Sequence, residues 1–148
     1  MDINLKKALR MTILKLEGLE YLVIGSMSLY LHGINVSPRD IDIITTPEIL
    51  EEIIVRLKEY QTKEVYFDKT EGRNSWRTFF DIEGIEVEVL CNVDNLAWSK
   101  NISGNKVFVE CDGIFIPCVS LEASIIAYEK MLRLKKVGLI KNFLNKPC

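Results

Sequence analysis

Two aspartates, Asp40 and Asp42, are separated by a single isoleucine inside an apolar stretch. Residues 40–44 predict a β-strand, and successive side chains of a strand point to opposite faces. Both carboxylates would then share one face while the isoleucines face the core. Carboxylate oxygens are ligands that Mg²⁺ accepts, and such a pair can bind the metal together with phosphate oxygens. An ordinary strand with one hydrated face would show the same pattern.

A Gly-Ser pair precedes the aspartates. The apolar run at residues 21–24, within a strand predicted over 20–24, stops at Gly25 and Ser26, and a short helix is predicted over residues 27–32. Glycine lets the backbone approach a ligand closely, and the N–H groups that begin a helix can bind phosphate. Ser26 could also be a simple helix cap. Combined with the downstream aspartates, however, this corner favours a magnesium–nucleotide site.

The joined motif, G-S-M-S-L-Y-L-H-G followed by S-P-R-D-I-D-I-I, resembles the nucleotidyltransferase superfamily with the polymerase-beta-like fold. Its form is most similar to the small prokaryotic nucleotidyltransferases, and the similarity extends over roughly residues 20–134. The resemblance implies transfer of a nucleoside monophosphate from an Mg–NTP to a hydroxyl acceptor on RNA, protein or a small molecule. It also implies catalysis by two metal ions, Mg²⁺ or Mn²⁺.

The resemblance further implies a third carboxylate on a later strand. Residues 75–82 and 85–90 predict two strands joined by a Glu83-Gly84 turn, which fixes their pairing. The face expected in the core carries Trp76, Thr78, Phe80, Ile82, Ile85, Val87 and Val89. The opposite, polar face carries Arg77, Phe79, Asp81, Glu86 and Glu88. Alternating acids on a hairpin can also be a hydrated sheet face.

The resemblance therefore gives a set of candidate site residues. The predicted catalytic and metal-binding residues are Asp40, Asp42 and Glu88, with Glu88 standing where the family usually has aspartate. The predicted nucleotide-binding residues are Gly25, Ser26 and Arg77. Arg77 could instead be only an ion-pair partner of the acids.

Several other side chains have open roles. Lys69 and Arg73 lie in a polar loop that could reach a triphosphate, and Glu86 and Lys130 have no assigned function. The only histidine, His32, is interpreted as structural. Trp98 and Tyr128 could stack on a base, although core packing is the commoner role for such residues.

Helical and strand patterns alternate along the chain. Helices are expected over residues 3–17, after Thr46 and over 122–134, with one more short helix in the basic tail 135–148. Further strands are expected over residues 62–67, 106–110 and 114–117, and residues 91–105 form a loop. The interleaving predicts an α/β (α+β) fold with a mixed β-sheet and flanking helices, the nucleotidyltransferase fold.

The composition of the 148 residues is that of a globular protein, and we expect a single domain over residues 1–148. The net charge of −2 gives no overall positive field for nucleic acid. The four cysteines lack a C-x-x-C spacing, so zinc is not expected. No apolar run is long enough to span a membrane and no signal peptide is visible, so we expect a cytoplasmic protein with reduced thiols.

Two function classes remain open from the sequence. The first is an active nucleotidyltransferase. The second is a catalytically silent member of the fold that binds nucleotides or proteins, which the glutamate at the third acid position favours. Members of this group often belong to toxin–antitoxin or phage-defence pairs, and the resemblance implies a small helical antitoxin-like partner. The short chain also leads us to expect a homodimer or a partner protein that helps recognise the acceptor.

Overall fold

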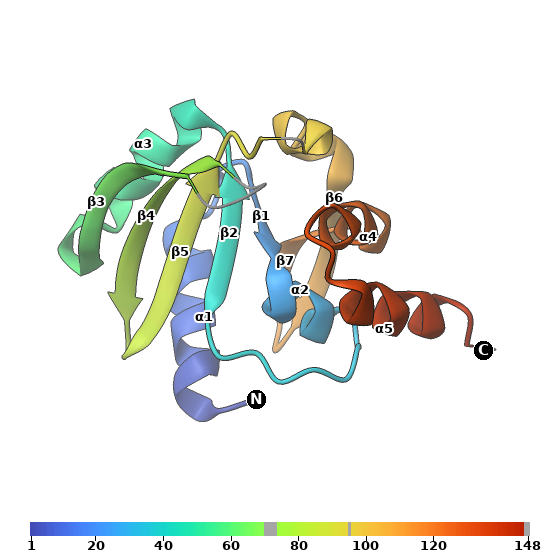
Figure 1. Cartoon of the computed structure of the whole chain (residues 1–148). Helices are drawn as coiled ribbons and strands as arrows, with labels where there is room; N and C mark the ends of the chain where they lie inside the picture. Colours follow the sequence, from blue (N-terminus) through green and yellow to red (C-terminus); the bar gives the residue numbers. More distant parts are fainter. Residues whose placement is uncertain (70–73, 95, 147–148) are drawn as a thin grey trace.

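The computed structural model describes residues 1–69, 74–94 and 96–146. These residues form a seven-stranded sheet with the strand order β3-β4-β5-β2-β1-β7-β6 and helices packed on it (Figure 1). The strands are β1 (Tyr21–Ile24), β2 (Ile41–Thr45), β3 (Gln61–Asp68), β4 (Ser75–Ile82), β5 (Ile85–Cys91), β6 (Lys106–Cys111) and β7 (Ile114–Val119). The helices are α1 (Ile3–Lys15), α2 (Gly25–Leu31), α3 (Pro47–Arg56), α4 (Leu121–Lys130) and α5 (Leu134–Leu144). The predicted α/β (α+β) fold with a mixed sheet is confirmed.

The mixed character of the sheet comes from its centre. Strand β2 pairs antiparallel with β1 and parallel with β5, and β1 pairs parallel with β7. In this register Asp42 lies opposite Ile24 on one side and Glu88 on the other. The residue after Ile24 is Gly25, so the end of β1 and the two acids meet at one place in the sheet.

Helices cover the two sheet faces differently. One face is covered by α1 and α3, and the side chains buried there include Leu9, Ile13, Leu50, Ile53, Ile43, Phe80 and Val87. The other face is covered at one end by α4, and the buried side chains there are Leu22, Ile44, Leu90, Ile102, Val119 and Ala123. Helix α5 packs beside α2 and α4 through Leu29, Tyr128, Val137 and Ile140.

The β4–β5 hairpin has the predicted register, with Ile82 opposite Ile85. Most of the side chains expected in the core are buried, but the expectation for Trp76 is wrong, because 43% of this residue is exposed. Trp76 lies beside the edge strand β3, where its ring meets that of Phe67 edge-on at a centroid distance of 5.2 Å. Among the described residues, no strand lies beyond β3 to cover the pair.

The predicted helix over residues 122–134 is also wrong, because it is interrupted. Helix α4 ends at Lys130, Leu132 has a left-handed backbone with φ +56°, and α5 begins at Leu134. Leu132 lies in this break, and 81% of the residue is exposed. The turn allows α5 to pack Val137 against α2 and α4 instead of continuing into solvent.

The structure also describes the start of α3, two of the cysteines and the length of the helices. Helix α3 begins at Pro47 after Thr46, whose hydroxyl accepts a hydrogen bond from the backbone of Ile49, as predicted. Cys111 and Cys118 do not face each other across the β6–β7 hairpin, and both are free thiols. Within the described part of the chain, no helix is both long and apolar enough to cross a bilayer.

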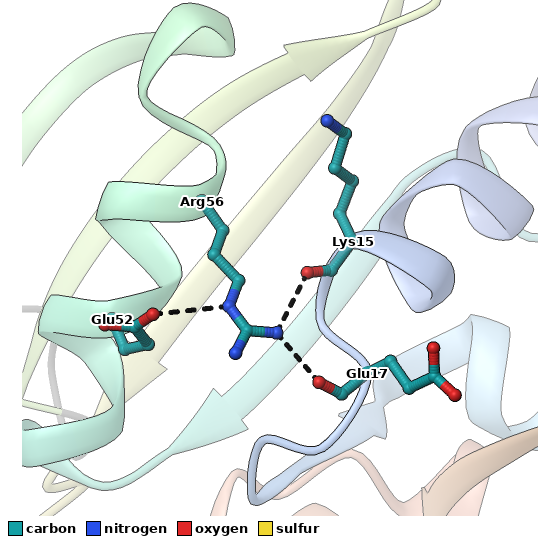
Figure 2. A network of polar contacts seen from close by, with 4 residues as sticks. All are labelled: Lys15, Glu17, Glu52 and Arg56. Atoms are coloured by element: carbon teal, nitrogen blue, oxygen red, sulfur yellow. Dashed lines mark hydrogen bonds and ion pairs between the residues drawn. The ribbon is translucent and has the colours of Figure 1, made fainter.

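A single arginine joins the ends of α1 and α3 (Figure 2). Arg56, in the last turn of α3, donates hydrogen bonds to the backbone carbonyls of Lys15 at 3.3 Å and Glu17 at 2.8 Å. Its Nε also donates to Glu52 at 3.3 Å. The carbonyl of Lys15, the last residue of α1, lacks an intrahelical partner and carries partial negative charge, so a guanidinium is a suitable donor to it. Glu17 follows the helix, and its carbonyl accepts from the same nitrogen.

We expect Arg56→Met to lower the free energy of unfolding by about 1 kcal/mol, because two carbonyl acceptors lose a charged donor. Lys15→Met is the matched control, since only the carbonyl of Lys15 takes part and its ammonium points away from Arg56 (Figure 2). Urea denaturation of the three proteins measures the effect. Equal losses in the two variants would show that the carbonyl contacts contribute nothing.

Candidate functional site

The Gly25 corner is built directly onto the end of β1. Helix α2 begins at Gly25 rather than at residue 27, because Ile24 is still extended and Gly25 turns the chain with φ +69°. A Cβ placed on Gly25 would lie 2.9 Å from Oδ2 of Asp42. Glycine is therefore required twice, for the backbone conformation and for the close approach of the Asp42 carboxylate.

Asp42 and Glu88 are the two acids that the fold brings together. They are direct neighbours on the parallel strands β2 and β5, and both line the same cavity. Arg77, on β4, approaches Glu88 from the other side: its Nη1 lies 3.1 Å from Glu88 Oε1, and its Nε lies 3.3 Å from Asp68. Arg77 is thus an ion-pair partner of the acids, which is one of its two predicted roles. It also lines the cavity, and its predicted nucleotide-binding role stays a prediction.

Asp40 is placed differently from the expectation. Strand β2 begins at Ile41, so Asp40 lies in the bend before the strand, where it is exposed and does not line the cavity. In the described ranges, no group of three or more His, Cys, Asp or Glu side chains is arranged to hold a metal ion. Of the three predicted acids, Asp42 and Glu88 are neighbours that line the cavity, whereas Asp40 lies before the strand, near enough for its charge to act on Asp42. The metal-binding role of all three stays a prediction.

Burial and like charges change the titration of Asp42. Its pKa is raised from 3.8 to about 7, chiefly by burial and then by the negative charges of Glu88, Asp40 and Glu86. The Arg77 guanidinium opposes the shift. An acid pair that resists being charged gains from a bound cation, which would restore the carboxylate form.

The cavity has a volume of about 260 Å³ and two chemically distinct ends. The polar end is formed by Gly25, Ser26, Asp42, Arg77 and Glu88. The mainly apolar end includes Ile44, Leu90, Val93, Leu96, Trp98 and Val119, together with the acid Asp94. Lys130 and Arg133 also line the cavity, and both are exposed residues at the α4–α5 junction.

Lys136 contacts the predicted site residue Ser26 and was missed by the sequence interpretation, although it is not among the described residues that line the cavity. It lies in the first turns of α5, and its Nζ is 3.3 Å from the Oγ of Ser26, to which it donates a hydrogen bond. The spacing of Lys130, Arg133 and Lys136 was visible in the sequence. Because a continuous helix was expected there, nothing indicated that the turn at Leu132 would aim α5 back at Ser26.

The remaining candidate residues differ in whether they line the cavity. Lys69 is exposed and does not line the cavity, and Arg73 lies outside the described residues. The Nε2 of His32 is 2.9 Å from the carbonyl oxygen of Val119, so the ring donates a hydrogen bond that joins α2 to β7. Tyr128 is buried and Trp98 is half-buried, and both line the cavity.

Comparison with known proteins gives the family. The model of aminoglycoside-2''-adenylyltransferases matches residues 10–138, which is most of the chain. The chain belongs to this family. The nucleotidyltransferase identity predicted from the Gly25-Ser26 and Asp40–Asp42 motifs is thereby confirmed, whereas the toxin–antitoxin association stays a prediction. Among curated protein sequences, none matches the chain significantly.

Solved structures agree with this family. A candidate nucleotidyltransferase from Thermotoga maritima, TM1012, is 31% identical, with a TM-score of 0.76; the alignment covers 97% of this chain and 94% of that one. The enzyme ANT(2'')-Ia, solved with adenylyl-2''-tobramycin, has the same fold at 13% identity and a TM-score of 0.58. That alignment covers 95% of this adenylyltransferase-family chain and 87% of the other.

The pKa of Asp42 leads to a stability test of the metal-free protein. Between pH 4 and 7 the native state binds a proton at Asp42 that the unfolded state has lost, so the stability falls as the pH rises and stays lower above pH 7. We expect Asp42→Asn to be more stable than the wild type at pH 8, by at least about 1 kcal/mol, and to differ much less at pH 4.

The measurement is chemical denaturation in EDTA at both pH values. Glu110→Gln is the control, because Glu110 is an exposed acid on the distant strand β6. A stability difference for Asp42→Asn that did not change with pH would contradict the assigned titration.

Proposed function

We propose that this chain is an active enzyme that transfers a nucleoside monophosphate from an NTP, with ATP the first candidate, to a hydroxyl group of a small molecule. The observation that carries the proposal is the Asp42–Glu88 pair, which lies beside the Gly25 corner within one cavity. The family description and the adenylylated tobramycin in ANT(2'')-Ia support ATP and an aminoglycoside-like acceptor.

The polar end of the cavity would hold the triphosphate. Ser26 supplies a hydroxyl, and Lys136 already donates to that hydroxyl. Lys130 and Arg133 add two more cations to the cavity lining. A nucleoside triphosphate carries several negative charges, and ammonium and guanidinium donors form charge-assisted hydrogen bonds with phosphate oxygens. Lys136 would release Ser26 and contact phosphate when the nucleotide binds.

The same end fits a divalent cation. Asp42 and Glu88 are neighbouring carboxylates. Because Gly25 has no side chain, its backbone lies close to Oδ2 of Asp42. Mg²⁺ or Mn²⁺ prefers such oxygen donors, and these two residues would hold it. When bound, the ion would neutralise phosphate charge and polarise the reacting oxygens. A second ion and a ligand role for Asp40 stay predictions.

The chain's own residues would act on the reaction in separate ways. The acceptor oxygen forms a bond to the α-phosphorus, the bond from that phosphorus to the pyrophosphate oxygen breaks, and the hydroxyl proton passes to a carboxylate of the acid pair. Arg77 keeps Glu88 in position through its ion pair at 3.1 Å. The cations around Ser26 hold the departing pyrophosphate, on which negative charge accumulates.

A nucleotide-binding protein without catalysis is the second candidate. The observation in its favour is the ion pair between Arg77 and Glu88, which already engages the acid predicted to complete the metal site. The two functions separate in a direct assay, because only the enzyme would release pyrophosphate. RNA or protein as acceptor, a homodimer, a helical antitoxin-like partner and a cytoplasmic location likewise stay predictions.

Activity should depend on both acids. We expect Asp42→Asn and Glu88→Gln each to lower the transfer rate at least about 100-fold, because each removes a charge needed to hold the cation and orient the α-phosphate. The transfer rate is measured by the release of pyrophosphate and by the transfer of an α-phosphate label from ATP to tobramycin. Glu110→Gln should keep wild-type activity. Unchanged rates in both acid variants would refute the assignment, and ATP binding without any transfer would favour the binding protein.

Lys136 should matter for nucleotide affinity. We expect Lys136→Met to weaken ATP binding about tenfold, because one charged hydrogen bond to the triphosphate is lost. Lys135→Met is the matched control, since Lys135 is its exposed neighbour on the same helix. Calorimetric titration with Mg–ATP gives both dissociation constants. Equal affinities in the two variants would mean that Lys136 only supports Ser26 structurally.

A further inference from the structure

Strand β6 is an edge of the sheet that lacks the usual protection against pairing with another chain. Among the described residues its only strand neighbour is β7, and every residue of β6 pairs with β7 without a bulge. The opposite edge strand, β3, is interrupted by register shifts on both sides of Lys63. Bulges and charged side chains discourage an edge from pairing with a further strand. The open edge of this sheet is therefore β6.

Two observations fix the direction of the backbone groups of β6. Ser120, directly after β7, donates its N–H at 2.8 Å to the carbonyl of the residue before Lys106, so these two residues are hydrogen-bonded. Phe108 lies opposite Pro117, which has no N–H, so this pair cannot exchange two hydrogen bonds. Because hydrogen-bonded and non-hydrogen-bonded pairs alternate in an antiparallel ladder, the backbone groups of Lys106, Phe108 and Glu110 are directed away from β7.

Apolar side chains accompany these outward backbone groups. Phe108 is 60% exposed, Val107 is 41% exposed, and Phe115 on β7 is 65% exposed. Phe115 lies opposite Glu110, which is two residues from Phe108, so both phenyl rings are on the same face of the sheet. The edge thus combines outward backbone donors and acceptors with an apolar surface, and both are needed for adding a strand from another chain.

We propose that β6 pairs antiparallel with β6 of a second copy of this chain, about a twofold axis that passes beside Phe108. In this register Phe108 exchanges both backbone hydrogen bonds with Phe108 of the second copy. The N–H of Glu110 donates to the carbonyl of Lys106 of the second copy, whose own N–H already donates to Ser103. Each chain presents the same surface, as a closed twofold dimer requires. The proposal is independent of the proposed function and gives the expected homodimer a defined interface.

The order of the side chains favours a second copy as the partner. Residues 106–110 read Lys-Val-Phe-Val-Glu, so Lys106 faces Glu110 of the second copy and Val107 faces Val109. Opposite charges and apolar side chains that face each other across antiparallel strands stabilise the pairing. Glu110 is exposed, and among the described residues it forms no ion pair within its own chain. A pairing shifted by two residues would separate the two charges.

Charge reversal tests the interface by sedimentation equilibrium at low ionic strength. We expect the wild type to be a dimer and Glu110→Lys to weaken it at least about tenfold, because both symmetric ion pairs become repulsions. Glu64→Lys is the matched control, since Glu64 is an exposed acid on the other edge strand, β3. It should leave the dissociation constant unchanged.

Mixing two variants tests the register. Lys106→Glu should also weaken the dimer, and circular dichroism checks its fold because the ion pair with Glu20 is lost as well. An equimolar mixture of Lys106→Glu and Glu110→Lys should form a heterodimer about as stable as the wild-type dimer. One chain then offers two cations exactly where the other offers two acids. Only a pairing that places residue 106 opposite residue 110 predicts this recovery.

A cross-link tests the twofold axis. In the proposed register the Cα atoms of the two copies of Phe108 lie about 5.5 Å apart, which suits a disulfide. We expect Phe108→Cys, in a Cys111→Ser and Cys148→Ser background, to give a covalent dimer on mild oxidation, seen by non-reducing electrophoresis. Phe115→Cys in the same background is the control, because its strand is one step removed from the axis. It should stay monomeric in the gel.

Several results would overturn the proposal. A wild type that is monomeric at its highest soluble concentration has no such interface. A dimer weakened by Glu64→Lys but not by Glu110→Lys would pair through β3, and cross-linking of Phe115→Cys instead of Phe108→Cys would mean that other faces meet. Pyrophosphate release tests the proposed function separately. Because one chain lines the whole described cavity, Glu110→Lys should retain the activity, and an inactive but dimeric wild type would refute only the proposed function.

Discussion

The parallel pairing of β2 with β5 is the constraint on which the candidate site depends. It places Asp42 beside Glu88, while the antiparallel pairing of β2 with β1 places the Gly25 corner on the other side of Asp42. Two neighbouring carboxylates in a partly buried position repel each other, and this repulsion contributes to the raised pKa of Asp42. Arg77 offsets part of the cost through Glu88. The remaining repulsion is what makes the site favourable for a cation.

The surrounding cavity completes this arrangement with two different environments. Lys136 lies beside Ser26, Lys130 and Arg133 line the cavity, and the apolar residues Ile44 and Leu90 continue along the same strands past the acids. A nucleotide has the same division, with a charged chain at one end and a flat ring at the other. This match of polarities is consistent with the proposed NTP.

Much of this could be predicted from local sequence. Gly25-Ser26, the Asp42 strand and the two-residue turn that fixes the β4–β5 register are short-range patterns, and each has a direct physical cause. The exposure of Trp76 could not be predicted, because it depends on which strand becomes the sheet edge. Lys136 was missed for a similar reason: its contact with Ser26 needs the left-handed turn at Leu132, and leucine gives no signal for such a turn.

The hydrogen bond between Lys136 and Ser26 joins residues 110 positions apart in sequence. The contact therefore exists only when α5, near the far end of the chain, is docked beside α2. The acids and the Gly25 corner, by contrast, are positioned by pairing within the sheet. The cation at Ser26 thus depends on a different part of the fold than the carboxylates do. Polyphosphate affinity would then report the docking of α5 as well as the integrity of the central strands.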